Sequence, residues 1–94
     1  IVQWDTSAVT VMNSLFRVQS DFNDDISLWD ISRVTSMSNM FDTAESFNAD
    51  LAAWDVSSVE SMNVMFNFAT VFTGDVSSWD TSNVNNMESM FRAV

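Results

Sequence analysis

The sequence has no cysteine and no histidine, no lysine and no proline, and a single glycine among its 94 residues. Without cysteine the chain has no disulfide framework and no thiolate chemistry. Without histidine as well, it lacks the side chains of an ordinary zinc site and of a Ser-His-Asp or Cys-His catalytic group. These absences exclude most classes of enzyme, so we expect a protein without catalytic residues and without enzymatic activity.

Positive charge is also scarce: the chain has three arginines and 13 acidic residues, which gives a formal net charge of -10. Such a charge repels phosphate backbones and anionic membrane surfaces, which argues against nucleic acid as a partner. Cations, cationic proteins and neutral sugars remain open. No continuous apolar run approaches the roughly 18 residues that a membrane-spanning helix needs, so we expect no membrane span.

One motif recurs every 25 residues along the whole chain. Tryptophan is followed directly by aspartate, and serine comes two residues after the aspartate; a phenylalanine column completes the expected core. The columns are Trp4, Trp29, Trp54 and Trp79; Asp5, Asp30, Asp55 and Asp80; Ser7, Ser32, Ser57 and Ser82; and Phe16, Phe41, Phe66 and Phe91. Self-similarity at a fixed period is typical of repeat architectures. Residues 1–94 therefore form one repeat segment with units of about 1–21 (partial), 22–46, 47–71 and 72–94 (partial).

The first half of each unit predicts a strand. Its apolar residues have the L-x-x-L-x-L spacing of a leucine-rich-repeat strand, in Ile26, Trp29 and Ile31 for example. In a strand Trp29 and Ile31 would point inward while Asp30 would point outward. The second half predicts a helix, because its apolar residues have the i, i+3, i+4, i+7 spacing of one helix face. These are Met37, Met40, Phe41 and Ala44 in the second unit.

Together the two patterns predict an α/β repeat, a leucine-rich-repeat-like solenoid with one short strand and one short helix per 25-residue unit. An all-helical repeat is the competing architecture, because Phe47, Leu51 and Trp54 are also at helix-like spacing. With no proline and one glycine, the turns must rely on Asn, Asp and Ser side chains that bind nearby backbone groups.

The combined unit, F-N-x-D-[I/L/V]-x-x-W-D-x-S-x-V-x-x-M-x-x-M-F-x-x-A, resembles the short repeats of BspA-like leucine-rich-repeat surface proteins. Such proteins occur in mycoplasmas, in Listeria, and in algae and protists. The resemblance covers the whole chain and implies a secreted or cell-surface protein connected with adhesion, with no assigned enzymatic activity. Three departures are local: Phe72-Thr73-Gly74 replaces the usual Phe-Asn, Gln19 stands where other units have a small apolar residue, and Leu15 replaces the first methionine of the Met-Phe pair.

The aspartate and serine columns are the main candidates for a binding site. If the units stack as parallel strands, neighbouring aspartates lie roughly 4.8 Å apart, so hydrogen bonds, protonation or cations must compensate their repulsion. We favour a structural interpretation, in which each aspartate accepts backbone or serine hydrogen bonds. Calcium binding and direct ligand contact remain alternatives for the same eight residues.

A second acidic column comprises Asp25, Asp50 and Asp75, joined in one unit by Asp21 and Asp24. Oxygen-rich sites without histidine or cysteine suit Ca²⁺. However, both the D-x-D-x-D-G loop of an EF-hand and a glycine-rich calcium repeat are missing. We therefore expect capped turns here, with no metal site and no cofactor, and Ca²⁺ as the less favoured reading.

The sequence thus indicates a non-enzymatic repeat scaffold that mediates protein or glycan binding, or adhesion, at a cell surface. The alternative is a structural subunit or segment within a larger macromolecular assembly, with no free ligand site, in an organelle or a large complex. Ile1 aligns with Ile26 and Val94 with Ala69, and neither end carries a polar capping sequence. We therefore expect further repeats or partner chains to flank the segment.

Overall fold

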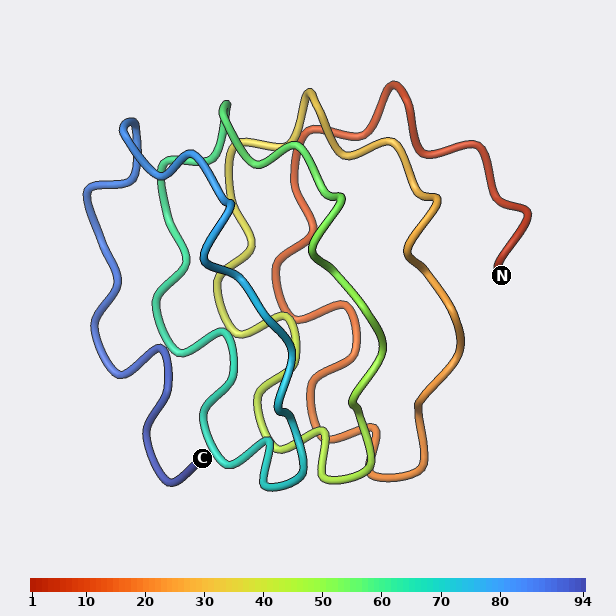
Figure 1. The fold of residues 1–94 in the computed structure, drawn as a ribbon, viewed down its shortest axis with the longest axis vertical. Coiled ribbons are helices and arrows are strands. Elements are labelled where there is room, and N and C mark those ends of the chain that lie inside the picture. Colours follow the sequence, from red (N-terminus) through yellow and green to blue (C-terminus); the bar gives the residue numbers. More distant parts are fainter.

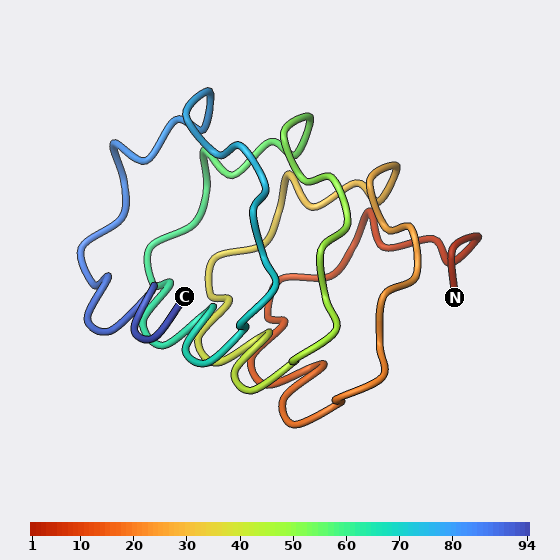
Figure 2. The ribbon, with the colours of Figure 1, turned by 60° about the horizontal axis from the view of Figure 1, so that its bottom comes forward.

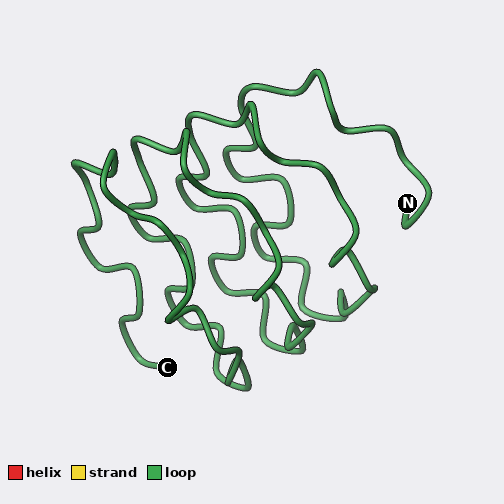
Figure 3. Cartoon of the chain, turned by 45° about the horizontal axis from the view of Figure 1, so that its top comes forward, coloured by secondary structure: helices red, strands yellow, loops and turns green.

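The computed structural model describes all of residues 1–94 and contains no helix and no continuous strand (Figure 3). Its only β-pairing consists of isolated parallel bridges, which join Val11 to Ser36, Ser36 to Ser61, and Ser61 to Asn86. The prediction of a leucine-rich-repeat-like α/β solenoid with one strand and one helix per unit is therefore wrong. The all-helical alternative is wrong for the same reason.

The chain forms irregular coils that lie side by side, with the N-terminus at one end and the C-terminus at the other (Figures 1 and 2). Each bridge joins residues 25 positions apart, so equivalent positions of successive units are neighbours. The whole is a compact globule with a radius of gyration of 11.9 Å. A globular domain of this length is expected to have a radius of gyration of about 12 Å.

The stretch predicted to be helical is a series of four-residue turns. The amide of Met40 donates to the carbonyl of Met37 at 3.2 Å, and the amide of Ala44 donates to that of Phe41 at 3.0 Å. The third residue of each turn has a left-handed backbone, with φ of 60° at Asn39 and 59° at Thr43. Because an α-helix needs a negative φ at every residue, these two positions exclude it. The first and last residues of two consecutive turns have the same spacing as one helix face, which explains the misleading pattern.

Amides that a helix would bond within itself are bonded to the next unit instead. The Phe41 amide donates to the carbonyl of Met65 at 2.9 Å, and the Thr43 amide to that of Asn67 at 2.7 Å. Equivalent bonds recur at every junction between units, four at each: from Met12, Ser14, Phe16 and Val18; from Met37, Asn39, Phe41 and Thr43; and from Met62, Val64, Phe66 and Phe68. Backbone pairing between units therefore replaces pairing along a helix.

The predicted strand is likewise two turns. The amide of Trp29 donates to the carbonyl of Ile26 at 3.1 Å, and the amide of Val34 donates to that of Ile31 at 2.9 Å. Trp29 and Ile31 are nevertheless buried and Asp30 is exposed, as they would be in a strand. The isolated β-bridges between units involve Ser36, which lies outside the predicted strand.

Apolar side chains from all the units meet in one core of 22 buried residues. Its aromatic rings form stacked columns along the coil axis; the centroids of Phe16 and Phe41 are 5.7 Å apart, and those of Phe41 and Phe66 are 5.5 Å apart. The buried members of the two aromatic columns predicted for the core are Trp29, Trp54, Trp79, Phe16, Phe41 and Phe66. Trp4 is 57% exposed and Phe91 is also exposed, because these two rings lie at opposite ends of the stack.

Candidate functional site

The aspartate and serine columns lie on one edge of the coils. We call this edge, made of Asp5, Ser7, Asp30, Ser32, Asp55, Ser57, Asp80 and Ser82, the aspartate edge. Its four turns follow one another as a row of projecting loops along the top of the molecule (Figure 1). The four carboxylates are exposed, and three of the four serines are half-buried. The structure thus brings all eight predicted residues onto one surface.

Each aspartate of this edge accepts hydrogen bonds from the serine two residues later. Oδ1 of Asp55 accepts from the Ser57 hydroxyl at 2.6 Å and from the Ser57 amide at 3.0 Å. The same pair of bonds occurs in the first two units, from Ser7 to Asp5 and from Ser32 to Asp30. In the last unit, the Ser82 amide donates to Asp80 at 3.1 Å. This is the Asx-turn, in which a side chain takes the place of a backbone carbonyl.

These bonds hold the aspartates in their charged form. The serine hydroxyl, followed by the serine amide, lowers the pKa of Asp5, Asp30, Asp55 and Asp80 below the usual value of 3.8. Neighbouring aspartates act in the opposite direction: the charges of Asp30 and Asp80 raise the pKa of Asp55, but by less than Ser57 lowers it. All four carboxylates are therefore negative at neutral pH, despite their mutual repulsion.

Only one oxygen of each carboxylate takes part in these turns. Oδ1 of Asp30 and Oδ1 of Asp55 receive all the protein hydrogen bonds that the two side chains accept. The second oxygen faces solvent, since both residues are exposed. The edge therefore presents a row of fixed, negatively charged acceptors that repeat once per unit.

The second acidic column has the same turn geometry. The Oδ1 atoms of Asp25, Asp50 and Asp75 accept backbone amides at 3.0, 2.9 and 2.9 Å. Hydrogen bonds from the serine two residues later lower the pKa of Asp25 and of Asp75. Asp21 and Asp24 are exposed and accept no hydrogen bond. No group of three or more potential metal ligands is gathered anywhere in the structure.

Sequence reasoning missed a buried carboxylate. Asp42 is only 6% exposed; its Oδ2 accepts from Nε of Arg17 at 3.1 Å, and its Oδ1 from Nδ2 of Asn67 at 3.0 Å. Arg17, Asp42 and Asn67 are spaced 25 residues apart, so they occupy the same position in successive units. The signal in the sequence was therefore a repeat position at which the residues differ in charge and complement one another. A search for recurring residues does not find such a column.

A second missed feature is a polar ladder beside the bridges. The Ser38 amide and the Ser36 hydroxyl both donate to Oδ1 of Asn13, at 3.0 and 2.6 Å. In the next unit the Ser61 hydroxyl donates to Oδ1 of Asn63 at 2.7 Å, and Ser38 bonds to both residues. These side chains hydrogen-bond to one another, which makes the ladder a structural feature of the stack.

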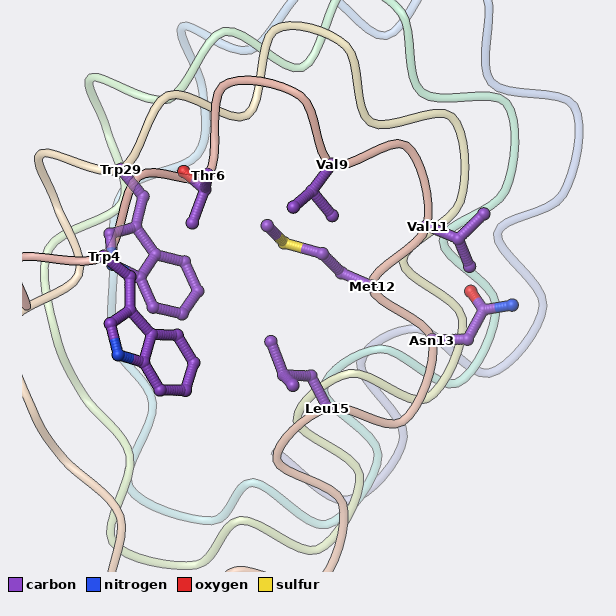
Figure 4. A pocket seen from close by; sticks show the side chains of 8 residues that line it. All are labelled: Trp4, Thr6, Val9, Val11, Met12, Asn13, Leu15 and Trp29. Atoms are coloured by element: carbon purple, nitrogen blue, oxygen red, sulfur yellow. The ribbon is translucent and has the colours of Figure 1, made fainter. Parts of the chain in front are cut away.

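The structure has one cavity, at the N-terminal end of the core, with a volume of about 190 Å³ (Figure 4). Leu15, Met12 and Val9 project into it from one side, and the rings of Trp4 and Trp29 from the other (Figure 4). Its lining has no ionisable side chain. The cavity is therefore a mainly apolar opening at the N-terminal end of the core.

The whole repeat segment matches one protein family. Residues 1–94 match a family described as "Mycoplasma protein of unknown function, DUF285". The chain belongs to this family. It is a mycoplasma-associated family of the BspA-like repeat type, which supports the resemblance at that level. No curated protein and no solved structure matches this DUF285 chain. The chain contains no helix that is long and apolar enough to cross a membrane.

Proposed function

We propose that this DUF285 chain is a non-enzymatic repeat scaffold at a cell surface, and that its aspartate edge binds a basic segment of a partner protein. The observation that carries the proposal is the row of carboxylates, each fixed through one oxygen by its own serine turn. The other oxygen remains available to a ligand. A preorganised acceptor costs less conformational entropy on binding than a mobile one.

Charge favours a basic protein over a neutral glycan as the partner. The chain has a net charge of -10, and lysine or arginine side chains spaced along an extended peptide can pair with successive carboxylates. Single exposed ion pairs contribute at most about 1 kcal/mol, so the affinity must come from several units acting together. The serine hydroxyls along the same edge support a neutral glycan as the alternative partner.

The test is binding of a lysine-rich decapeptide, measured by isothermal titration calorimetry at low salt. The double variant Asp30→Asn, Asp55→Asn should bind at least tenfold more weakly, because it loses two charges while the amide oxygens still accept from Ser32 and Ser57. Raising the salt to 0.5 M should also weaken binding, since exposed ion pairs are screened.

The matched control is the double variant Asp21→Asn, Asp24→Asn, which changes the net charge equally at carboxylates outside the edge. It should bind the peptide within about twofold of the unaltered chain. Equal losses in both double variants would show that only the overall charge matters and would overturn the site. Binding of a neutral oligosaccharide that neither salt nor the asparagines affect would favour the glycan instead.

The surface location needs its own experiment. An antibody raised against the chain should label intact, unpermeabilised cells of the source organism, and protease added outside should remove the signal. Labelling only after permeabilisation would contradict this part of the proposal. It would favour the alternative function, a structural segment within a larger assembly.

A further inference from the structure

Hydrogen bonds hold each unit only to the units directly before and after it. Every backbone hydrogen bond either closes a turn between residues three apart or joins residues 24 to 26 apart in neighbouring units. Side-chain bonds have a similar reach: the widest separation is 28 residues, as between the Trp54 indole and the Ile26 carbonyl. No bond therefore skips a unit, and the stack is a one-dimensional array in which each unit depends on its nearest neighbours.

Within a single unit, little holds the coil in its shape. The bond between Met40 and Met37, like every other backbone bond inside a unit, closes a turn of only four residues. Two residues of every unit also have a left-handed backbone, which costs an L-residue free energy. In the two internal units they are Asn39, Thr43, Val64 and Phe68. A unit that loses its neighbours therefore has no backbone bond that keeps the coil closed, and unwinding relieves its strain.

The bonds between units run from coil to coil along the stack, and the chain passes from one end of the stack to the other (Figure 1). A pull on both ends of the chain therefore loads the junction of an outermost coil first. The bonds of that junction break one after another as the coil peels away. Because no bond skips a unit, the next coil keeps all of its bonds to the coil behind it.

We infer that this chain is an extensible element, which lengthens under tension by one whole unit at a time. Uncoiling one unit frees 25 residues, or about 90 Å of extended chain, and removes one coil of about 5 Å from the stack. Each step should therefore lengthen the molecule by about 85 Å. At a cell surface such steps would limit the load on a partner bound at the aspartate edge. That use rests on the proposed function, whereas the stepwise release does not.

Optical tweezers test the inference, with the 94-residue chain held through peptide tags fused to both ends. As the force rises, the extension should increase in successive steps of about 85 Å, and relaxation should reverse them. Unfolding of the whole chain at once would instead release about 310 Å, because 94 extended residues span about 340 Å and the folded molecule is 30 Å in its longest dimension. A single release of that size, or steps unrelated to 25 residues, would overturn the inference.

A disulfide between two units identifies the steps. Ser36 and Ser61 are β-bridge partners, and bridged backbones lie about 4.8 Å apart, which a disulfide can span. The chain has no cysteine of its own. The oxidised Ser36→Cys, Ser61→Cys protein should show one step fewer than the same protein after reduction, which is its matched control.

An oxidised protein that keeps every step, with its crosslink confirmed by mass spectrometry, would contradict the assignment of one step to one unit. The Asp30→Asn, Asp55→Asn protein should lengthen in the same steps as the unaltered chain, since these side chains make no bond between units. Failure of stepwise release and failure of the proposed partner site are therefore separate results.

Discussion

Nε1 of Trp54 donates a 3.0 Å hydrogen bond to the backbone carbonyl of Ile26, which lies in the preceding unit. The same bond recurs 25 residues later, between Trp79 and Leu51. Trp54 is only 4% exposed, so one side chain fills the core and also ties two coils together. The tryptophan column thus couples the packing of each unit to the backbone of the unit before it.

Replacing Trp54 should therefore separate these two contributions. Trp54→Phe keeps an aromatic ring but loses the indole donor, and it should lower the free energy of unfolding by about 1 kcal/mol. Trp54→Ala also leaves a cavity, and it should cost about 3–5 kcal/mol. Urea denaturation followed by circular dichroism measures both changes. Trp4→Phe is the control: the Trp4 indole has no acceptor and is mostly exposed, so a loss as large as that of Trp54→Phe would contradict this account.

The spacing of apolar residues predicted which residues are buried far better than it predicted their backbone. Met37 and Met40 are fully buried. An i, i+3, i+4, i+7 pattern fits one helix face, but it also fits two consecutive four-residue turns. What decides between them is the left-handed backbone at Asn39, whose amide bonds to Asn63 of the next unit. A bond to the following unit is not encoded in the local sequence, so local propensity could not reveal it.

In the candidate site, too, contacts within one unit could be predicted from the sequence, whereas contacts between units could not. The interpretation that the aspartates accept backbone or serine hydrogen bonds rested on the recurrence of the same residues in every unit. The bonds between Asp55 and Ser57 lie within a single turn, two residues apart. Asp42 was missed because two of its partners, Arg17 and Asn67, come from the two neighbouring units and are of different residue types. Binding of a partner to the aspartate edge depends on molecules outside the chain and stays a prediction, with Ca²⁺ binding as the less favoured alternative.

Stability should depend on pH through the aspartate turns. The native pKa values of Asp5, Asp30, Asp55 and Asp80 are lowered, chiefly by serine hydroxyls, while in the unfolded chain they return to about 3.8. The hydrogen bonds therefore stabilise the native state fully above the unfolded pKa, and this contribution is lost as the pH falls through the lower native values. Urea midpoints should hold near pH 5 and fall below about pH 3.8. Relief of repulsion as the net charge of -10 shrinks acts in the opposite sense.

Ser57→Ala tests the cause of this pH dependence at a single turn. The variant removes the hydroxyl donor but leaves the backbone amide, so the pKa of Asp55 should move upward toward 3.8. NMR titration of the side-chain carboxyl carbon measures this value, with Asp30 in the same sample as the internal control. An unchanged pKa of Asp55 would mean that the hydroxyl is not what lowers it.

Removing the buried carboxylate should be costly because its partners remain. Asp42→Ala leaves Nε of Arg17 and Nδ2 of Asn67 without the acceptor they share. We expect a loss of about 2 kcal/mol in the free energy of unfolding, less than for a fully buried ion pair because Arg17 is half exposed. Asp21→Ala, at an exposed carboxylate with no partner, should change it by less than about 0.5 kcal/mol. Equal effects in the two variants would contradict a structural role for Asp42.

Backbone strain makes one exposed valine a target for stabilisation. Val18 has a φ of 60° and is 57% exposed, so a β-branched side chain is held in the left-handed region with little packing in return. That region costs an L-residue about 1–2 kcal/mol, whereas glycine enters it freely but loses about 0.5–1 kcal/mol of conformational entropy on folding. Val18→Gly should therefore raise the free energy of unfolding by about 0.5–1 kcal/mol. Val71→Gly is the matched control, because Val71 is 47% exposed and has no positive φ. There the entropy cost has no strain to offset it, so the same substitution should destabilise the protein. Urea midpoints that move in the same direction for both variants would show that the left-handed backbone at Val18 stores no strain.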